Sequence, residues 1–295
     1  MNRIKKCFII CAAVFCIGTG MCLGGVFAGG ISDIDKVAKN HDWLVGSPGK
    51  IQVAGGGEID FDSVEATGNL DLVLLGSEYM KSPGDEYLPS ELSEVISAEQ
   101  PGEGTVLIAC GKNVEVPKNY VDNGTLKIEG NPGDDGVLTI NFSSDDVTPT
   151  VVVFCGDKSL KKIDASNNFC DFVIQGVSFE KAELWGSDND IVMDGVRSGS
   201  LKIDGNCTDA DLRGDFFGTT DIEIDDGDVE IETSVSREEY AMDIYAEDGD
   251  IEIADGEIEV DEKPWKYSCE GGPNKLNIRI ARGDVELFFG DTLYR

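Results

Sequence analysis

Short acidic turns are the parts of this sequence whose residue types and spacing are most suggestive of chemistry. In the C-terminal half two turns read Asp-Gly-Asp, at 226–228 and 248–250, and a related Asp-Asn-Asp turn lies at 188–190. If such turns stack on one another, their oxygens gather as a hard cation such as Ca²⁺ requires. Aspartate beside glycine is also ordinary turn chemistry, so a solvated turn is the competing interpretation. The candidate metal ligands are Asp226, Asp228, Asp248 and Asp250.

The sequence lacks the residue combinations that the common catalytic sites require. The single histidine, His41, precedes the strand-rich part of the chain, so no Ser–His–Asp or Cys–His arrangement is expected there. Carboxylates are abundant, and a carbohydrate-active β-helix enzyme would require a pair of them beside an aromatic-lined groove. Aromatic residues make up only 8% of the chain and are scattered. We therefore predict no catalytic residue and no cofactor apart from calcium.

Cysteine spacing gives little support to a metal or disulfide framework. Beyond residue 30 the chain has Cys110, Cys155, Cys170, Cys207 and Cys269, an odd number without a CxxC pair. Burial as small strand residues is the simplest interpretation. In an oxidising compartment, Cys155 and Cys170 are the candidate pair for a single bridge.

The charge balance excludes one class of partner. The chain has 57 acidic and 24 basic residues, a formal net charge of −33. A field of this sign repels nucleic acids and anionic lipid headgroups. Nucleic-acid binding is therefore excluded.

The N-terminus predicts export. Residues 1–6 form a basic tip, and residues 7–30 contain no charged side chain, which is long enough for a transmembrane signal anchor. The basic flank places the tip in the cytoplasm and the rest outside. A cleaved signal peptide over 1–28 is the alternative, and it would make the protein secreted. Residues 31–49 form a polar connector to an acidic β-repeat domain over 50–295.

That domain consists of short runs in which apolar and acidic residues alternate, as in Asp221-Ile222-Glu223-Ile224-Asp225. Alternation at period two predicts half-buried strands. Equivalent apolar residues recur about every 20 residues, which is typical of a β-solenoid in which each rung stacks on the preceding one. A sandwich or meander with Asp-Gly hairpins is the competing architecture. The two recurring series are Leu184, Ile203, Ile222, Ile244 and Ile191, Leu212, Val229, Ile251.

Two polar stretches interrupt the repeats. We interpret 76–104 and 261–274 as inserted loops, with a short helix near 89–98. Trp265 and Tyr267 in the second stretch are either contact residues or a cap on the core. Stacking would also place Glu223 or Glu230 one strand from Glu252, about 4.8 Å away, at a cost in repulsion. We therefore expect stability to rise with ionic strength, and more with calcium.

Several motifs lie in the run from Ser159 to Phe289. They are Leu160-Lys161-Lys162-Ile163-Asp164-Ala165, the recurring Gly-Asp-Ile/Val-Glu-Ile units, 272–280 and 282–287. With these motifs the run resembles a bacterial family of membrane-anchored putative adhesins, domains of unknown function built from β-strand repeats. The resemblance implies a single-stranded right-handed β-helix outside the membrane, and it brings no catalytic residues.

These observations predict a non-enzymatic cell-surface solenoid held to the membrane by its N-terminal helix. Adhesion, envelope sensing and scaffolding are all compatible with it, and the partner would be a protein or a surface polymer. A calcium-stabilised structural spacer and a carbohydrate-active enzyme are the alternatives.

Overall fold

The computed structural model describes residues 52–53, 61–81, 103–104, 106–109, 126–130, 136–142, 148–253 and 264–290. Most of these residues are in β-strands. The predicted N-terminal anchor, the connector with His41 and the helix near 89–98 lie outside these ranges. Within the ranges, no helix is both long and apolar enough to cross a membrane.

The strands at 71–76, 150–156 and 172–175 are buried at every position. The alternation predicted from sequence is confirmed in most strands of the C-terminal half. In 240–248, for example, every second side chain is buried as far as Ala246, and the acidic end is exposed. The strands are β1 Gln52–Val53, β2 Ser63–Gly68, β3 Asp71–Gly76, β4 Val106–Ala109, β5 Leu126–Gly130, β6 Val137–Phe142, β7 Thr150–Gly156, β8 Ser159–Ser166, β9 Phe172–Gln175, β10 Ser178–Asp226, β11 Val229–Thr233, β12 Tyr240–Asp248, β13 Ile251–Ile253, β14 Trp265–Cys269, β15 Asn274–Arg282 and β16 Val285–Phe289. The helical elements are α3 Ser77–Lys81 and the 3₁₀ turn η2 Arg237–Glu239.

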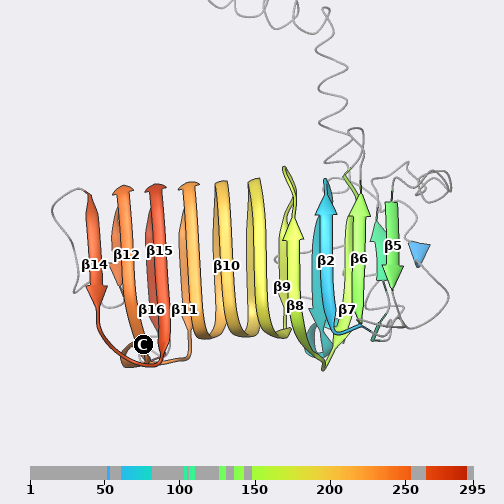
Figure 1. Ribbon diagram of the computed structural model, residues 1–295, viewed down its shortest axis with the longest axis horizontal. Coiled ribbons are helices and arrows are strands. Elements are labelled where there is room, and N and C mark those ends of the chain that lie inside the picture. The colour runs from blue at the N-terminus through green and yellow to red at the C-terminus, as the bar shows by residue number, and fades with distance from the viewer. Residues whose placement is uncertain are drawn as a thin grey trace, which may run out of the picture.

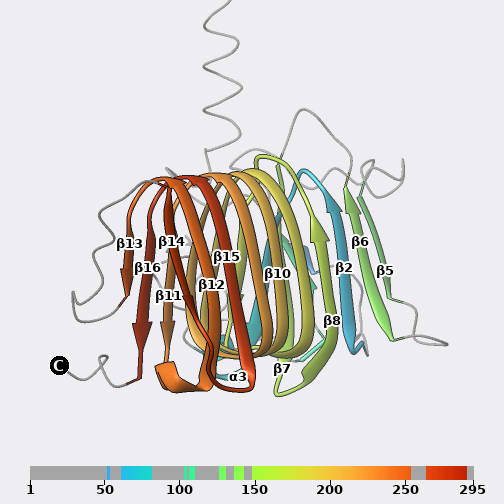
Figure 2. The ribbon, with the colours of Figure 1, turned by 60° about the vertical axis from the view of Figure 1, so that its left-hand side comes forward.

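The chain winds as a row of rungs, each of which contributes one strand to each of two facing stacks (Figures 1 and 2). We call the stack that contains β2, β8, β12 and β15 the first stack, and the stack that contains β3, β9, β11 and β16 the second stack. The long β10 runs through several successive coils. The repeat in this part is 19 residues: Leu160 is in register with Phe179, Phe172 with Ile191, and Ala210 with Val229, all in parallel. A solenoid is therefore confirmed, and because neighbouring rungs pair in parallel, the meander of hairpins is wrong.

The last rung in the chain is not the last rung in space. β15 pairs in parallel with both β10 and β12, so Ile278 lies between Ile222 and Ile244. On the second stack β16 likewise lies between β11 and β13, and Val285 separates Val229 from Ile251. The predicted order, with each rung on the preceding one, is therefore wrong at this end. Identical alternation in all three units leaves no local signal for which of them are neighbours.

The first described rung is inserted in the same way. β2 pairs in parallel with β6 and with β8, and β3 pairs with β7 and with β9. The rung formed by β2 and β3 therefore lies between two rungs that come later in the sequence. At both ends of the row, the outermost complete rung comes from the interior of the chain.

Antiparallel strands close the row. β5 pairs with β6, β4 with β7, and β14 with β12. The predicted loop over 261–274 is therefore wrong in its described part, because Trp265–Cys269 is strand β14. Trp265 and Tyr267 are half-buried against the core, which confirms them as a cap. Such strands cover the ladder edge that an open solenoid would otherwise present to other chains.

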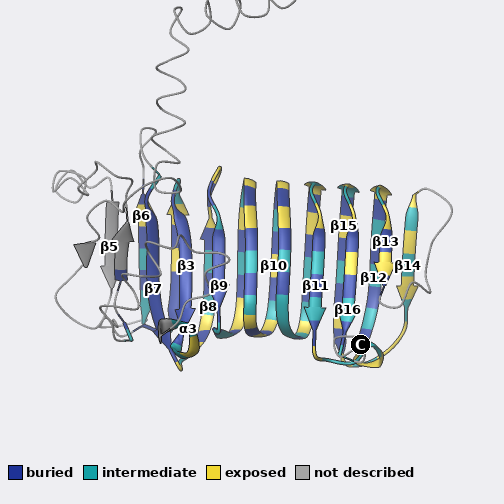
Figure 3. Ribbon diagram, turned by 180° about the vertical axis from the view of Figure 1, so that it is seen from behind, coloured by how far each residue is buried: buried dark blue, intermediate teal, exposed yellow. Residues whose placement is uncertain are grey.

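The core is the column of inward-facing apolar side chains between the two stacks. Buried residues recur on every rung along the row (Figure 3). Leu184, Ile203, Ile222, Ile278 and Ile244 are all buried within it. One assignment in the second predicted series is wrong: Leu212 is in register with Ile231, and the neighbour of Val229 is Ala210. A two-residue slip keeps the same face inward, so alternation could not detect it.

Outward-facing acids also form columns. Glu230 is in register with Glu286, and Glu286 with Glu252, so the predicted neighbours Glu230 and Glu252 are two strands apart. On the side of the inserted rung, Glu223 is beside Arg279. Burial, and then the charge of Asp211, raises the pKa of Glu230. We call the column Asp211, Glu230, Glu286 and Glu252 the glutamate column.

Candidate functional site

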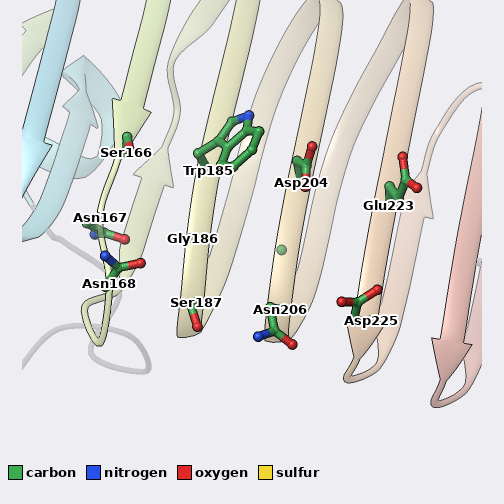
Figure 4. Close-up of a pocket in the computed structure, with 11 residues that line it drawn as sticks. Ser166, Asn167, Asn168, Trp185, Gly186, Ser187, Asp204, Asn206, Glu223 and Asp225 are labelled. Atoms are coloured by element: carbon green, nitrogen blue, oxygen red, sulfur yellow. The ribbon is translucent and has the colours of Figure 1, made fainter.

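A groove lies on the outer face of the first stack (Figure 4). Its volume is about 330 Å³. We call it the Trp185 groove. Its lining residues are Ser166, Asn167, Asn168, Trp185, Gly186, Ser187, Asp204, Gly205, Asn206, Glu223 and Asp225.

The 19-residue repeat is what brings these residues together. Trp185 is in register with Ser166 on the neighbouring rung. Asp204 and Glu223 follow at further intervals of 19, and they project from the next two rungs beside Trp185 (Figure 4). A second column, two residues further along each rung, contains Asn168, Ser187, Asn206 and Asp225. Because alternate strand residues share a face, both columns point outward.

Main chain forms the floor of the groove, because two successive rungs have glycine at the inward-facing position between the columns. A Cβ at Gly186 would lie 2.3 Å from Nδ2 of Asn189, and a Cβ at Gly205 would lie 2.5 Å from Oγ1 of Thr208. Asn189 and Thr208 are buried there, and the Thr208 hydroxyl donates to Oδ1 of Asn189 at 2.7 Å. This interior polar contact leaves no room for side chains, so glycine is required at both positions.

One of the two large hydrophobic side chains that are exposed in the described residues lines this groove: Trp185, which is 53% exposed. The other, Phe169, is 71% exposed and lies at the turn that follows the lining residue Asn168, outside the lining. Phe169 has a φ of 61°, in the left-handed region that non-glycine residues rarely adopt. Asp188 and Cys207 have similar φ values at equivalent positions, 19 and 38 residues further on. An exposed indole in a groove is typical of interaction sites.

Hydrogen-bond acceptors dominate the polar lining. Asp204, Glu223 and Asp225 contribute carboxylates, and no lysine, arginine or histidine is among the lining residues of the described chain. The nearest cation that contacts one of these acids is Lys202, whose Nζ lies 3.8 Å from Oδ2 of Asp204. Arg279 is next to Glu223 in register but does not line the groove. The groove thus suits a ligand that donates hydrogen bonds.

The predicted metal ligands lie elsewhere, at the turns between the two stacks. Asp226 forms an ion pair with Arg282 at 2.9 Å, and Arg282 is also in register with Asp248. The inserted rung therefore places an arginine between Asp226 and Asp248. Among the residues that the structure describes, no group of three or more histidine, cysteine or acidic side chains is arranged to hold a metal ion.

Asp228 and Asp250 belong instead to a ladder of aspartates that bonds each turn to the next. Oδ1 of Asp228 accepts the N–H of Asp284 at 2.8 Å, and Oδ1 of Asp284 accepts the N–H of Asp250 at 2.8 Å. Earlier rungs show the same contact from Asp228 N–H to Asp209 and from Asp190 N–H to Asp171. These carboxylates thus satisfy main-chain donors at the turns. Calcium binding by the four candidates stays a prediction.

The first member of the ladder is buried. Asp71 accepts the N–H of Asp171 at 3.2 Å and the hydroxyl of Thr150 at 3.1 Å. Burial, and then the charge of Asp171, raises the pKa of Asp71 to about 7. At neutral pH this carboxyl is thus close to half-protonated, whereas an ordinary aspartate is ionised.

The cysteines in the described residues are free thiols. Cys155 and Cys170 are both buried and form no bridge, in contrast to the predicted pairing. Burial raises the pKa of both thiols, which keeps them protonated and unreactive.

Sequence reasoning missed the groove entirely. Trp185 and Asp204 stand at outward positions, which alternation alone identifies only as solvated. Aligning the chain at a strict 19-residue repeat would have placed Trp185 beside Asp204 and Gly186 beside Gly205. The scattered aromatic residues argued against an aromatic-lined groove, yet Trp185 lines one together with Asp204.

A search of curated proteins finds no match. Among solved structures, the chain is similar to a putative cell adhesion protein from Clostridium sporogenes ATCC 15579, with 13% identity over 82% of this chain and 100% of the other, at a TM-score of 0.35. It is similar to a putative adhesin from Bacteroides fragilis NCTC 9343, with 12% identity over 81% and 97% of the two chains, at a TM-score of 0.31. At these TM-scores we draw no functional conclusion from either protein.

The family model described as Toastrack DUF4097 matches residues 109–289, which include the regular coils of β10, the groove and the inserted last rung. This match spans more than half of the sequence. The chain therefore belongs to the Toastrack DUF4097 family.

Proposed function

We propose that this protein is a non-enzymatic recognition module on the cell surface, and that the Trp185 groove is its binding site. The observation that supports this most is the exposed indole of Trp185 in a groove that is lined by the carboxylates of Asp204, Glu223 and Asp225. Exposing such a side chain to water is unfavourable, so a ligand that covers it would gain free energy.

The scaffold suits a binding role. The groove lies on three or more strands of one parallel stack, and the glycine floor is fixed by the buried contact between Asn189 and Thr208. Sites on rigid strands lose little conformational entropy when a ligand binds. The apolar N-terminal segment would hold this face outside the membrane.

Site-specific photo-crosslinking in intact cells tests the proposal. A benzophenone amino acid replaces Ser187 at the groove, and in a second variant it replaces the exposed Glu252 on β13 of the second stack. We expect crosslinked products from position 187 and none from position 252. Added protease should remove the domain from unbroken cells. Equal products from both positions, or a domain protected from protease, would contradict the proposal.

A carbohydrate-active enzyme is the second candidate, since the groove combines an aromatic ring with acids. Cleavage requires two carboxylates on opposite sides of a glycosidic bond. Asp204 and Glu223 instead project side by side from neighbouring rungs (Figure 4). Saccharides incubated with the protein should therefore remain intact by mass spectrometry, and shortened products would favour the enzyme.

A further inference from the structure

We propose that the Trp185 groove binds an amino sugar, with the sugar ring against the indole of Trp185 and the ammonium group among the groove carboxylates. This inference rests on the proposed function and adds a ligand class to it.

The indole provides the surface for the ring. Trp185 is 53% exposed, and its side chain stands on the outer face beside the glycine floor (Figure 4). The C–H face of a pyranose is apolar, and it packs against an aromatic ring while the hydroxyl groups project sideways. Tryptophan suits such a role because it combines a large apolar surface with a polar N–H at its edge.

The lining selects the charge of the ligand. Carboxylates of Asp204, Glu223 and Asp225 face the groove, and the basic side chains in the described chain lie outside its lining. An anionic sugar would be repelled by these groups and by the net charge of −33. An ammonium group would form charge-assisted hydrogen bonds with the carboxylates, and it is also attracted to the face of an indole.

The neutral part of the lining supplies the remaining contacts. Asn168 and Asn206 each offer one amide acceptor and two donors, and Ser166 and Ser187 offer hydroxyls. They lie mainly on the earlier rungs of the two columns, and the acids lie on the later rungs. Hydroxyl groups of a sugar are both donors and acceptors, so they match this mixture of groups. A peptide with lysine side chains also carries ammonium groups, but the aliphatic part of lysine cannot form these hydrogen bonds.

The size of the groove suits a short segment of a saccharide. About 330 Å³ is at the lower end of the range of small-molecule sites, roughly 300–1,000 Å³. Because neighbouring rungs are about 4.8 Å apart, successive acids lie at intervals comparable to the size of a sugar ring.

Three probes of matched length test the inference: a glucosamine tetramer, its N-acetylated neutral counterpart and tetralysine. Each is titrated into the full chain in a non-ionic detergent at pH 6 and low salt, with calorimetry and tryptophan fluorescence as readouts. Trp43, Trp185 and Trp265 are the three fluorophores, so Trp265→Phe is the matched control for Trp185→Phe.

We expect the glucosamine tetramer to bind about tenfold more tightly than the other two probes, since one or two ion pairs and one stacked ring each add a factor of this order. The fluorescence change should disappear in Trp185→Phe and persist in Trp265→Phe. Trp185→Ala, Asp204→Asn and Asp225→Asn should each weaken binding several-fold, and the affinity should fall with added salt.

Equal or tighter binding of the N-acetylated tetramer would overturn the charge assignment. Equal binding of tetralysine would overturn the sugar assignment. Binding that is unchanged in Trp185→Ala would overturn the site. If no probe binds while position 187 still gives crosslinks in cells, the ligand class is wrong and the proposed function stands; if both fail, the groove is not a binding site.

Discussion

Asp71 gives the sharpest test of the energetics of this fold. Its carboxyl group is 7% exposed, and its pKa of about 7 compares with 3.8 for an unperturbed aspartate. The proton is therefore bound more tightly in the folded chain than in the unfolded one. The contribution of this protonation to the free energy of unfolding is fully present below about pH 4, and it is lost as the pH rises through 7. The difference of about three units between the folded and unfolded pKa values corresponds to about 4 kcal/mol of unfolding free energy.

Between pH 5 and pH 8 the loss from Asp71 alone is about 2.5 kcal/mol, because part of the effect already occurs below pH 5. Asp71→Asn removes the titrating group, and an amide can still accept the N–H of Asp171 and donate to the Thr150 hydroxyl. We expect the free energy of unfolding of the wild type to fall by about 2.5 kcal/mol more than that of Asp71→Asn over this range.

Denaturant unfolding of the full chain, followed by circular dichroism at half-unit pH steps, measures this difference. Glu180→Gln, which removes an exposed carboxylate, is the control and should keep the pH dependence of the wild type. Parallel curves for the wild type and Asp71→Asn would refute the reasoning, because burial would then not be raising this pKa.

Three further predictions concern the columns and turns. Glu286→Gln, which removes a central charge of the glutamate column, should raise the free energy of unfolding by about 0.5–1 kcal/mol at low salt; a gain that does not shrink in 0.5 M NaCl would contradict an electrostatic cause. Cys207→Gly should stabilise by about 0.5–1 kcal/mol relative to Cys207→Ala in thermal unfolding, because φ is 56° at this position; equal stabilities would show that the turn is unstrained. Under mild oxidation, the double substitution Asp221→Cys and Asn277→Cys should form a disulfide, since Asn277 donates to Asp221 at 2.6 Å on the neighbouring strand. The pair Asp221→Cys and Asp243→Cys should not, since these positions are two strands apart. The reverse pattern on a non-reducing gel would contradict the inserted rung.

The sequence was sufficient for the parts of the fold that depend on local pattern. Period-two alternation predicted the strands, and the recurrence of Leu184, Ile203 and Ile222 predicted stacked coils of about 20 residues. Both follow from burying one face of each strand, and this requirement is the same in every rung. The right-handed winding and the N-terminal anchor remain predictions.

Features that depend on relations between rungs could not be predicted. Ile244 and Ile278 present the same side chain to a neighbouring rung, so the sequence does not distinguish which one follows Ile222. The groove depends on a register accurate to one residue, whereas the predicted second series was two residues out at Leu212. Trp185 becomes part of a groove only once the rungs on both sides are placed correctly.

The inserted first and last rungs would have a mechanical consequence if the predicted N-terminal anchor tethers the domain at one end. In a solenoid of sequential rungs, tension along the chain peels off the outermost rung, which is held by one neighbour on each stack. Here β2 is in register with six residues of β6 and five of β8, and β16 with five residues of β11 and three of β13. A pull on either end of the described domain must therefore shear two ladders of hydrogen bonds at once. The row would resist unravelling from its termini, and it would keep the Trp185 groove intact under load.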